Sequence, residues 1–144
     1  MPNLRVYNHQ DVVRLSAGLC RRLESCGLLA LSEVLTLTQK NSSVLQDLDE
    51  IEVSLLDDEM IADVHLRFMS IPGPTDVITF DHGEIHIGVE TAVIQAGEYG
   101  NDVERELMLY IVHGLLHLAG YDDGTEKEEA IMDELQQSIL SKVW

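Results

Sequence analysis

Basic residues are scarce in this chain: nine Lys and Arg stand against 26 Asp and Glu, which gives a formal net charge of −17 over 144 residues. Proteins that grip bare nucleic acid usually carry a basic face, because phosphate neutralisation supplies most of their non-specific affinity. We therefore expect this protein to bind naked RNA weakly, and we expect its acidic surface to keep it in solution.

Other absences narrow the class of protein further. No apolar run approaches the roughly 20 residues that a membrane-spanning helix needs, and no basic stretch followed by an apolar run opens the chain as a secretion signal would. Only two cysteines are present, Cys20 and Cys26, and we expect them to point in different directions on one helix and to stay reduced. These features predict a cytoplasmic protein that contacts no membrane.

Aromatic residues make up only 5% of the chain, whereas apolar residues make up 45%, so the core must consist mainly of Leu, Ile and Val. The length and composition fit one globular domain over residues 1–144. No internal repeat, low-complexity tract or Pro/Gly/Ser linker divides the sequence.

Apolar spacing and turn residues predict a mixture of helices and strands. We expect strands near 3–7, 51–56, 76–80 and 84–88, helices near 10–26, 58–68, 91–99, 102–119 and 127–142, and either state over 29–50. The last two strands should form a hairpin. Asp57-Asp58 offers an N-cap for the second helix, and Asn101 with Glu104 a capping box for the fourth. The fold class is therefore α+β, a small mixed sheet packed against helices.

One segment carries recognisable chemistry: His113-Gly-Leu-Leu-His117-Leu-Ala-Gly120-Tyr-Asp-Asp123. His113 and His117 are four residues apart on a helix, so both imidazoles leave the same face. Gly120 should end that helix in a left-handed conformation, which lets Asp123 turn back toward the histidines. Two imidazoles and one carboxylate leave a fourth position open for water or substrate, as in catalytic zinc sites. We predict one zinc ion on His113, His117 and Asp123, held on a central helix.

The spacing also matches the metzincin motif His-Glu-x-x-His-x-x-Gly-x-x-His, where the helical pair, the turn glycine and the third ligand follow the same intervals. Gly114 stands where that motif has the glutamate that acts as general base. This loss argues against peptide hydrolysis, but another metal-dependent hydrolase, including a peptidase, remains an alternative. A histidine pair at this spacing can also be purely structural.

The segment resembles the YbeY family of endoribonucleases, whose motif reads His-Gly-x-Leu-His-Leu-x-Gly-Tyr-Asp-His. The chain matches this motif from His113 to Asp122 and has Asp123 in place of the last histidine. A second family signature, Pro-Thr-Asp-Val followed by a hydroxyl residue and Phe, is present between Pro74 and Phe80. The resemblance covers residues 51–140.

The resemblance implies an α+β fold and a zinc-dependent endonuclease that cuts single-stranded RNA. It places this activity in ribosomal RNA maturation and ribosome quality control in the cytoplasm. The implied partners are ribosomal RNA or the small ribosomal subunit, together with ribosomal or assembly proteins. The strong acidity keeps open a further alternative, a non-catalytic assembly factor that binds metal only to fold.

Two positions depart from the family pattern. Asp123 in place of histidine preserves a zinc ligand but adds a negative charge, which should make the metal a weaker Lewis acid. Family members usually carry an Arg five residues before Pro74, where this chain has Met69. Arg67 is the nearest arginine, and we expect it either to contact a phosphate as a catalytic residue or to face solvent.

Four other residues have weaker signals. We expect His86 to be a structural histidine on the strand face opposite its apolar neighbours, and Asp76 to stabilise a turn. Asp122 should either fix the tautomer of a ligand histidine or cap a turn. Met132 should pack beneath the site.

Overall fold

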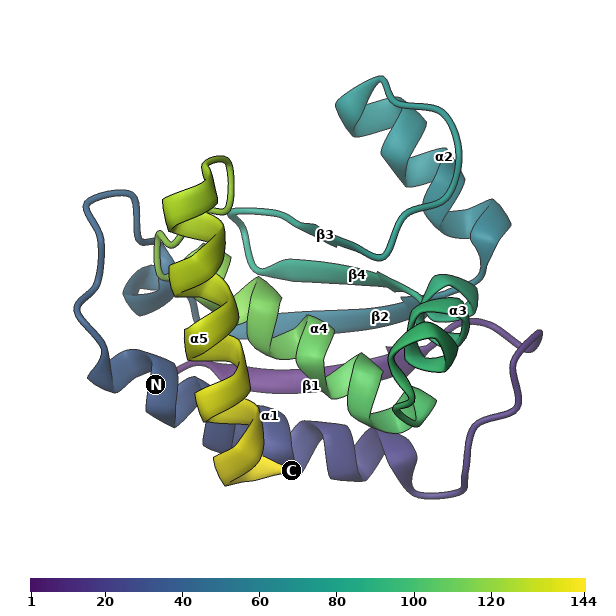
Figure 1. Cartoon of the computed structure of the whole chain (residues 1–144), viewed down its shortest axis with the longest axis horizontal. Coiled ribbons are helices and arrows are strands. Elements are labelled where there is room, and N and C mark those ends of the chain that lie inside the picture. The colour runs from purple at the N-terminus through teal and green to yellow at the C-terminus, as the bar shows by residue number, and fades with distance from the viewer.

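The computed structural model describes residues 1–144 and contains four strands and five α-helices (Figure 1). In chain order these are β1 (Asn3–Asn8), α1 (Leu19–Thr36), β2 (Glu50–Leu56), α2 (Asp58–Met69), β3 (Val77–Thr79), β4 (Glu84–Gly88), α3 (Val89–Tyr99), α4 (Val103–Leu118) and α5 (Glu126–Val143). A single 3-10 turn, Leu45–Asp47, precedes β2. The mixture of elements confirms the α+β class.

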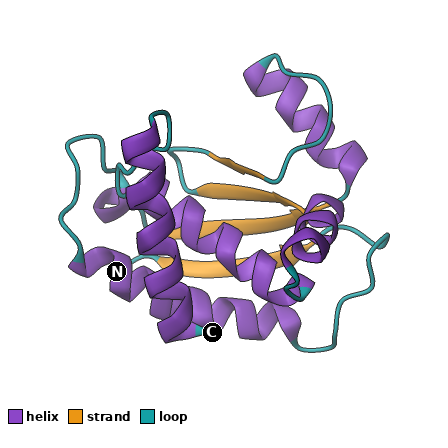
Figure 2. Ribbon diagram, in the orientation of Figure 1, coloured by secondary structure: helices purple, strands orange, loops and turns teal.

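The four strands form one mixed sheet in the order β1-β2-β4-β3 (Figure 2). β1, β2 and β4 are parallel, and β3 runs antiparallel to β4, which confirms the predicted hairpin. Val53 at the centre of β2 pairs with Val6 on one side and Ile85 on the other. This register places the apolar residues of neighbouring strands on the same face of the sheet, because side chains alternate along a strand.

That apolar face builds the main core together with α1, α4 and α5. The core consists mostly of Leu, Ile and Val, as the scarcity of aromatics predicted. α4 lies in the middle of the molecule and buries ten of its sixteen residues, so it is the central helix of the fold. Burying one large aliphatic side chain stabilises a protein by about 1.5–3 kcal/mol, so this packing holds α4 firmly against the sheet.

The prediction of a helix over 10–26 was right for residues 19–26 and wrong for residues 10–18, because α1 begins at Leu19 and continues to Thr36. Before it, the Gln10 side chain closes a local turn: its Oε1 accepts from Val13 N at 2.8 Å and its Nε2 donates to Val13 O at 2.9 Å. Gly18 at the start of α1 has a φ of 82°, which a regular helix does not allow. The apolar residues between 10 and 18 therefore have helical spacing although they form no helix.

The N-cap residues of α2 and α4 can be compared with the sequence-based predictions. Asp57 caps α2 as predicted, since its Oδ1 accepts from Met60 N at 2.9 Å. α4 is capped by Asp102, whose Oδ1 accepts from Arg105 N at 2.8 Å, so the capping box at Asn101 was wrong by one residue. Both residue types are good N-caps, so the residue type alone could not distinguish Asn101 from Asp102.

Several smaller predictions are confirmed. Cys20 and Cys26 are both free. Met132 is buried in the main core. His86 lies on the opposite face of β4 from Ile85 and Ile87, which are fully buried. None of the helices combines the length and apolar character that crossing a membrane requires.

Candidate metal centre

α4 presents two imidazoles from neighbouring turns of one face. His113 and His117 have ring centroids 4.5 Å apart in an edge-to-face arrangement, and their Nε2 atoms are 2.9 Å apart. Their side chains are only 20% and 25% exposed. The pair is therefore mostly shielded from bulk water, with both Nε2 atoms directed to one point.

The turn after α4 returns the chain to these histidines. Gly120 has a φ of 91°, its N donates to His117 O at 2.9 Å, and Tyr121 N donates to Leu116 O at 3.0 Å. This pair of bonds is the Schellman arrangement that ends a helix with a left-handed residue. A Cβ at Gly120 would also lie 2.6 Å from the Cβ of Lys40. The predicted glycine stop is confirmed, and two independent constraints require glycine there.

The turn brings the Asp123 carboxylate to the two imidazoles. Its Oδ2 lies 3.6 Å from His113 Nε2 and 3.8 Å from His117 Nε2. A metal ion equidistant from these three atoms and in their plane would lie about 2.0 Å from each of them. This distance is close to zinc bond lengths of about 2.0–2.2 Å. The structure thus brings together the three predicted ligands, and these residues fit one divalent metal ion.

A residue from α5 orients the first ligand. His113 Nδ1 donates to the side-chain oxygen of Gln136. This bond holds the proton on Nδ1 and leaves the Nε2 lone pair for a metal. This was one of the two roles expected of Asp122, but its Oδ1 is 3.8 Å from His117 Nδ1, which is too long for a hydrogen bond. Gln136 was missed because no pattern within α5 reveals which of its residues faces α4.

The environment of His117 favours its neutral form. Burial lowers the pKa of this imidazole, and the neighbouring His113 lowers it further. Asp123 and Asp122 act in the opposite direction, but the net pKa stays below its ordinary value. A neutral imidazole is the form that binds a metal ion, so burial prepares His117 for ligation.

Gly114 shows why the peptidase base is absent. A Cβ at this position would lie 2.7 Å from the Cδ1 of Ile85, because α4 packs directly on β4 there. No side chain, and certainly no glutamate, fits between the helix and the sheet without displacing Ile85. Glycine therefore suits the close packing of α4 on β4 at this position, and a glutamate here would require Ile85 to move.

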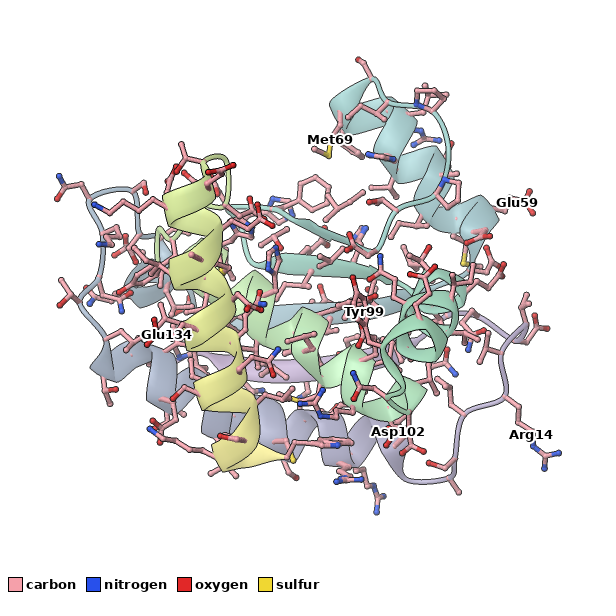
Figure 3. All side chains as sticks on the ribbon, in the orientation of Figure 1. Arg14, Glu59, Met69, Tyr99, Asp102 and Glu134 are labelled. Carbon is pink, nitrogen blue, oxygen red and sulfur yellow. The ribbon has the colours of Figure 1, made fainter.

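Arg67 lies apart from the three ligands. Its Nη2 is 3.4 Å from Asp63 Oδ2 on the same helix, and its side chain is 70% exposed. Met69, which takes the place of the usual family arginine, is the last residue of α2 (Figure 3), and it lines the same groove as the three ligands. The catalytic role of Arg67 remains a prediction.

A groove of about 740 Å³ leads to the metal centre. Its walls come from the end of α2, from β3 and from the turn after α4, and they include all three ligands. No Lys or Arg lines this groove, whereas four aspartates do: Asp76, Asp81, Asp122 and Asp123. Asp76 also stabilises the turn before β3, as predicted, by accepting from Val77 N at 2.7 Å.

A second cavity, of about 680 Å³, meets the metal centre from the other side, and His113 lines both spaces. Glu106 lines this cavity although it is only 3% exposed. Burial raises the pKa of its carboxyl group, and Tyr110 and Arg105 partly offset that effect. The Tyr110 hydroxyl itself donates to Gln95.

Comparison with known proteins agrees with this geometry. Residues 28–144 match the family model described as Endoribonuclease YbeY. The chain is 40% identical to Endoribonuclease YbeY of Acholeplasma laidlawii over 111 residues, covering 69% of this chain and 81% of that protein. It is 38% identical to Endoribonuclease YbeY of Moorella thermoacetica over 113 residues, covering 65% and 72%.

The fold has a solved counterpart. The solution structure of TM1509 from Thermotoga maritima superimposes with a TM-score of 0.66 at 25% sequence identity. The match covers 98% of this chain and 89% of that protein, so it includes β1 and the first half of α1, which precede the family match at residue 28. With the metal motif on α4 and the family match over residues 28–144, the chain belongs to the YbeY endoribonuclease family.

Proposed function

We propose that this protein is a zinc-dependent endoribonuclease that cuts single-stranded RNA during ribosomal RNA maturation and ribosome quality control. The observation that carries the proposal is that the ligand atoms of His113, His117 and Asp123 lie close enough together to bind one zinc ion, in a chain of an endoribonuclease family. Zinc is favoured because two imidazoles and one carboxylate are a common donor set for catalytic zinc. A ribosomal substrate would imply that the enzyme works in the cytoplasm.

The chemistry follows from what each residue holds. A zinc ion bound here would polarise a phosphoryl oxygen and bring the pKa of a water toward neutrality. Gln136 keeps the proton of His113 on Nδ1, so that Nε2 stays a ligand. Asp123 adds a negative charge that the histidine of the usual family motif does not carry. A zinc ion bound here should therefore be a milder Lewis acid.

The groove determines which substrates can approach. Its four aspartates repel phosphates, and no cation on its walls offsets them. Such repulsion is screened over about 8 Å at physiological salt, so it lowers affinity without preventing contact at the metal. We therefore propose that the enzyme acts on RNA presented by the small ribosomal subunit, docked through ribosomal or assembly proteins.

Arg67 would supply a secondary phosphate contact. Its ion pair with Asp63 is exposed on both sides, and such pairs contribute only about 0–1 kcal/mol, so the side chain is free to turn to a phosphate. Arg67→Ala should lower RNA cleavage modestly and leave zinc binding unchanged. Cleavage equal to that of the unchanged protein would remove Arg67 from the catalytic set.

One experiment separates the proposed function from its alternatives. Zinc-loaded protein and the His113→Ala variant are incubated with single-stranded RNA, duplex RNA and casein. We expect the unchanged protein to cut only single-stranded RNA, and a chelator to abolish the cleavage. Digestion of casein would favour a peptidase. Retained zinc with no cleavage, together with sedimentation on small ribosomal subunits, would favour the assembly factor.

A further inference from the structure

Both phenylalanines of the chain lie in the groove beside the metal centre. Phe68 stands at the end of α2 and is 65% exposed, and Phe80 follows β3. Neither belongs to the main core, although burying a phenylalanine stabilises a protein by about 1.5–3 kcal/mol. A chain with so few aromatics therefore leaves one of its two phenylalanine rings open to solvent at the site.

The two rings are held in a defined arrangement. Phe68 meets Phe80 edge-to-face, with centroids 5.3 Å apart and an interplanar angle of 76°. Phe80 is itself stacked on His82 at 5.4 Å and lies edge-on to His86 at 5.3 Å. Phe80 is thus supported by three rings, and it braces Phe68 from one side.

The electrostatics of the groove point to what can occupy it. Its walls carry four aspartates and no basic residue, so phosphates gain nothing from them. Nucleobases are uncharged and every base has a face that stacks on an aromatic ring. Apart from a phosphate contact at the metal, any affinity for RNA that the side chains of this groove provide must therefore come from bases.

We propose that Phe68 is a stacking platform for one unpaired nucleobase of the RNA, next to the phosphate at the metal centre. The inference rests on the proposed function, because it assumes an RNA substrate. A base within a duplex hides its faces in the helical stack, whereas an unpaired base can leave it and stack on a side chain. The platform thus gives a structural reason for a preference for single strands.

The test is a double-mutant cycle between the protein and the RNA. A single-stranded oligonucleotide of about ten nucleotides, 2′-O-methylated to resist cleavage, is bound to the zinc-loaded protein at low salt. Versions with one abasic position each locate the base that matters. Binding of every version is then measured with the unchanged protein and with Phe68→Ala, and Phe68→Trp tests rescue.

One stacked base accounts for a factor of roughly 5 to 150 in affinity, which corresponds to about 1–3 kcal/mol. We expect one abasic position to cost the unchanged protein this factor. Phe68→Ala should cost the same factor with the intact strand and lose nothing more with that abasic strand. The slope of affinity against salt should be equal for both proteins, because phenylalanine contacts no phosphate.

Leu66→Ala is the matched control, because Leu66 is 56% exposed on the same helix and does not line the groove. It should bind every strand as the unchanged protein does. Equal losses for Leu66→Ala and Phe68→Ala would overturn the inference, because they would show a general effect of shortening apolar side chains on α2 rather than stacking on Phe68. Independent, additive losses from Phe68→Ala and the abasic position would overturn it as well, and so would unchanged affinity of Phe68→Ala.

Cleavage of unmodified RNA, measured in parallel, separates this inference from the proposed function. Coupling between Phe68 and one base in a protein that cuts no RNA would support the platform and refute the nuclease. Cleavage without coupling would refute the platform and leave the nuclease intact.

Discussion

Replacing Gln136 by Leu should weaken zinc binding while the fold persists. In the structure His113 Nδ1 donates to the Gln136 side chain, and Leu retains similar bulk without an acceptor. His113 then loses the bond that fixes its tautomer and ring orientation. Losses of this kind reduce metal affinity 10- to 100-fold, which is about 1.4–2.8 kcal/mol. The direct contacts to zinc remain, so binding should be weakened rather than abolished.

The assay is competition for zinc against a chromophoric chelator at neutral pH, with circular dichroism to establish that each variant is folded. Gln136→Glu should bind at least as tightly as the unchanged protein, because a carboxylate is a stronger acceptor for a ligand histidine. Gln137→Leu is the control, since Gln137 is exposed and its side chain has no hydrogen bond to a metal ligand; its Oε1 accepts only from Arg105 Nη2, at 3.5 Å. If folded Gln136→Leu bound zinc with unchanged affinity, the orienting role of Gln136 would be refuted.

Three more predictions concern single residues. His113→Ala should abolish zinc binding and RNA cleavage with a modest stability loss, since Ala is the best helix former; cleavage by a metal-free variant would contradict this. Asp123→His, which restores the family ligand, should retain zinc and full activity, and loss of zinc from the folded variant would show that the turn accepts only a carboxylate. Burial raises the pKa of Glu106 above its ordinary 4.5, so the folded protein binds more protons than the unfolded chain and stability falls as pH rises from 4.5 through the raised pKa. Glu106→Gln should therefore reduce the loss of unfolding free energy over that range, measured by urea unfolding at several pH values, and an unchanged pH dependence would count against a buried carboxyl group.

Features encoded within one helix or one turn could be predicted from the sequence. His113 and His117 share a face because of helical periodicity, and Gly120 ends the helix for a reason that is local to the backbone. The hairpin of β3 and β4 and the cap at Asp57 are equally local. These signals were sufficient to place the three metal ligands together.

Features that depend on how elements cross could not be predicted. Gln136 reaches His113 only because α5 packs against α4, and Phe68 enters the groove only because α2 ends beside β3. The prediction of where α1 begins was wrong for a related reason. The Gln10 side chain holds its own turn closed, so tertiary and side-chain bonds replaced the helix that the apolar spacing indicated.

The central claim is that three residues of this chain bind one catalytic metal ion. Anomalous diffraction at the zinc edge, from crystals grown with zinc, tests it most directly. The account predicts a single ion about 2.0–2.2 Å from His113 Nε2, His117 Nε2 and an oxygen of Asp123, with a fourth position facing the groove. An ion bound elsewhere, or Asp123 directed to solvent while the histidines hold the metal, would contradict it.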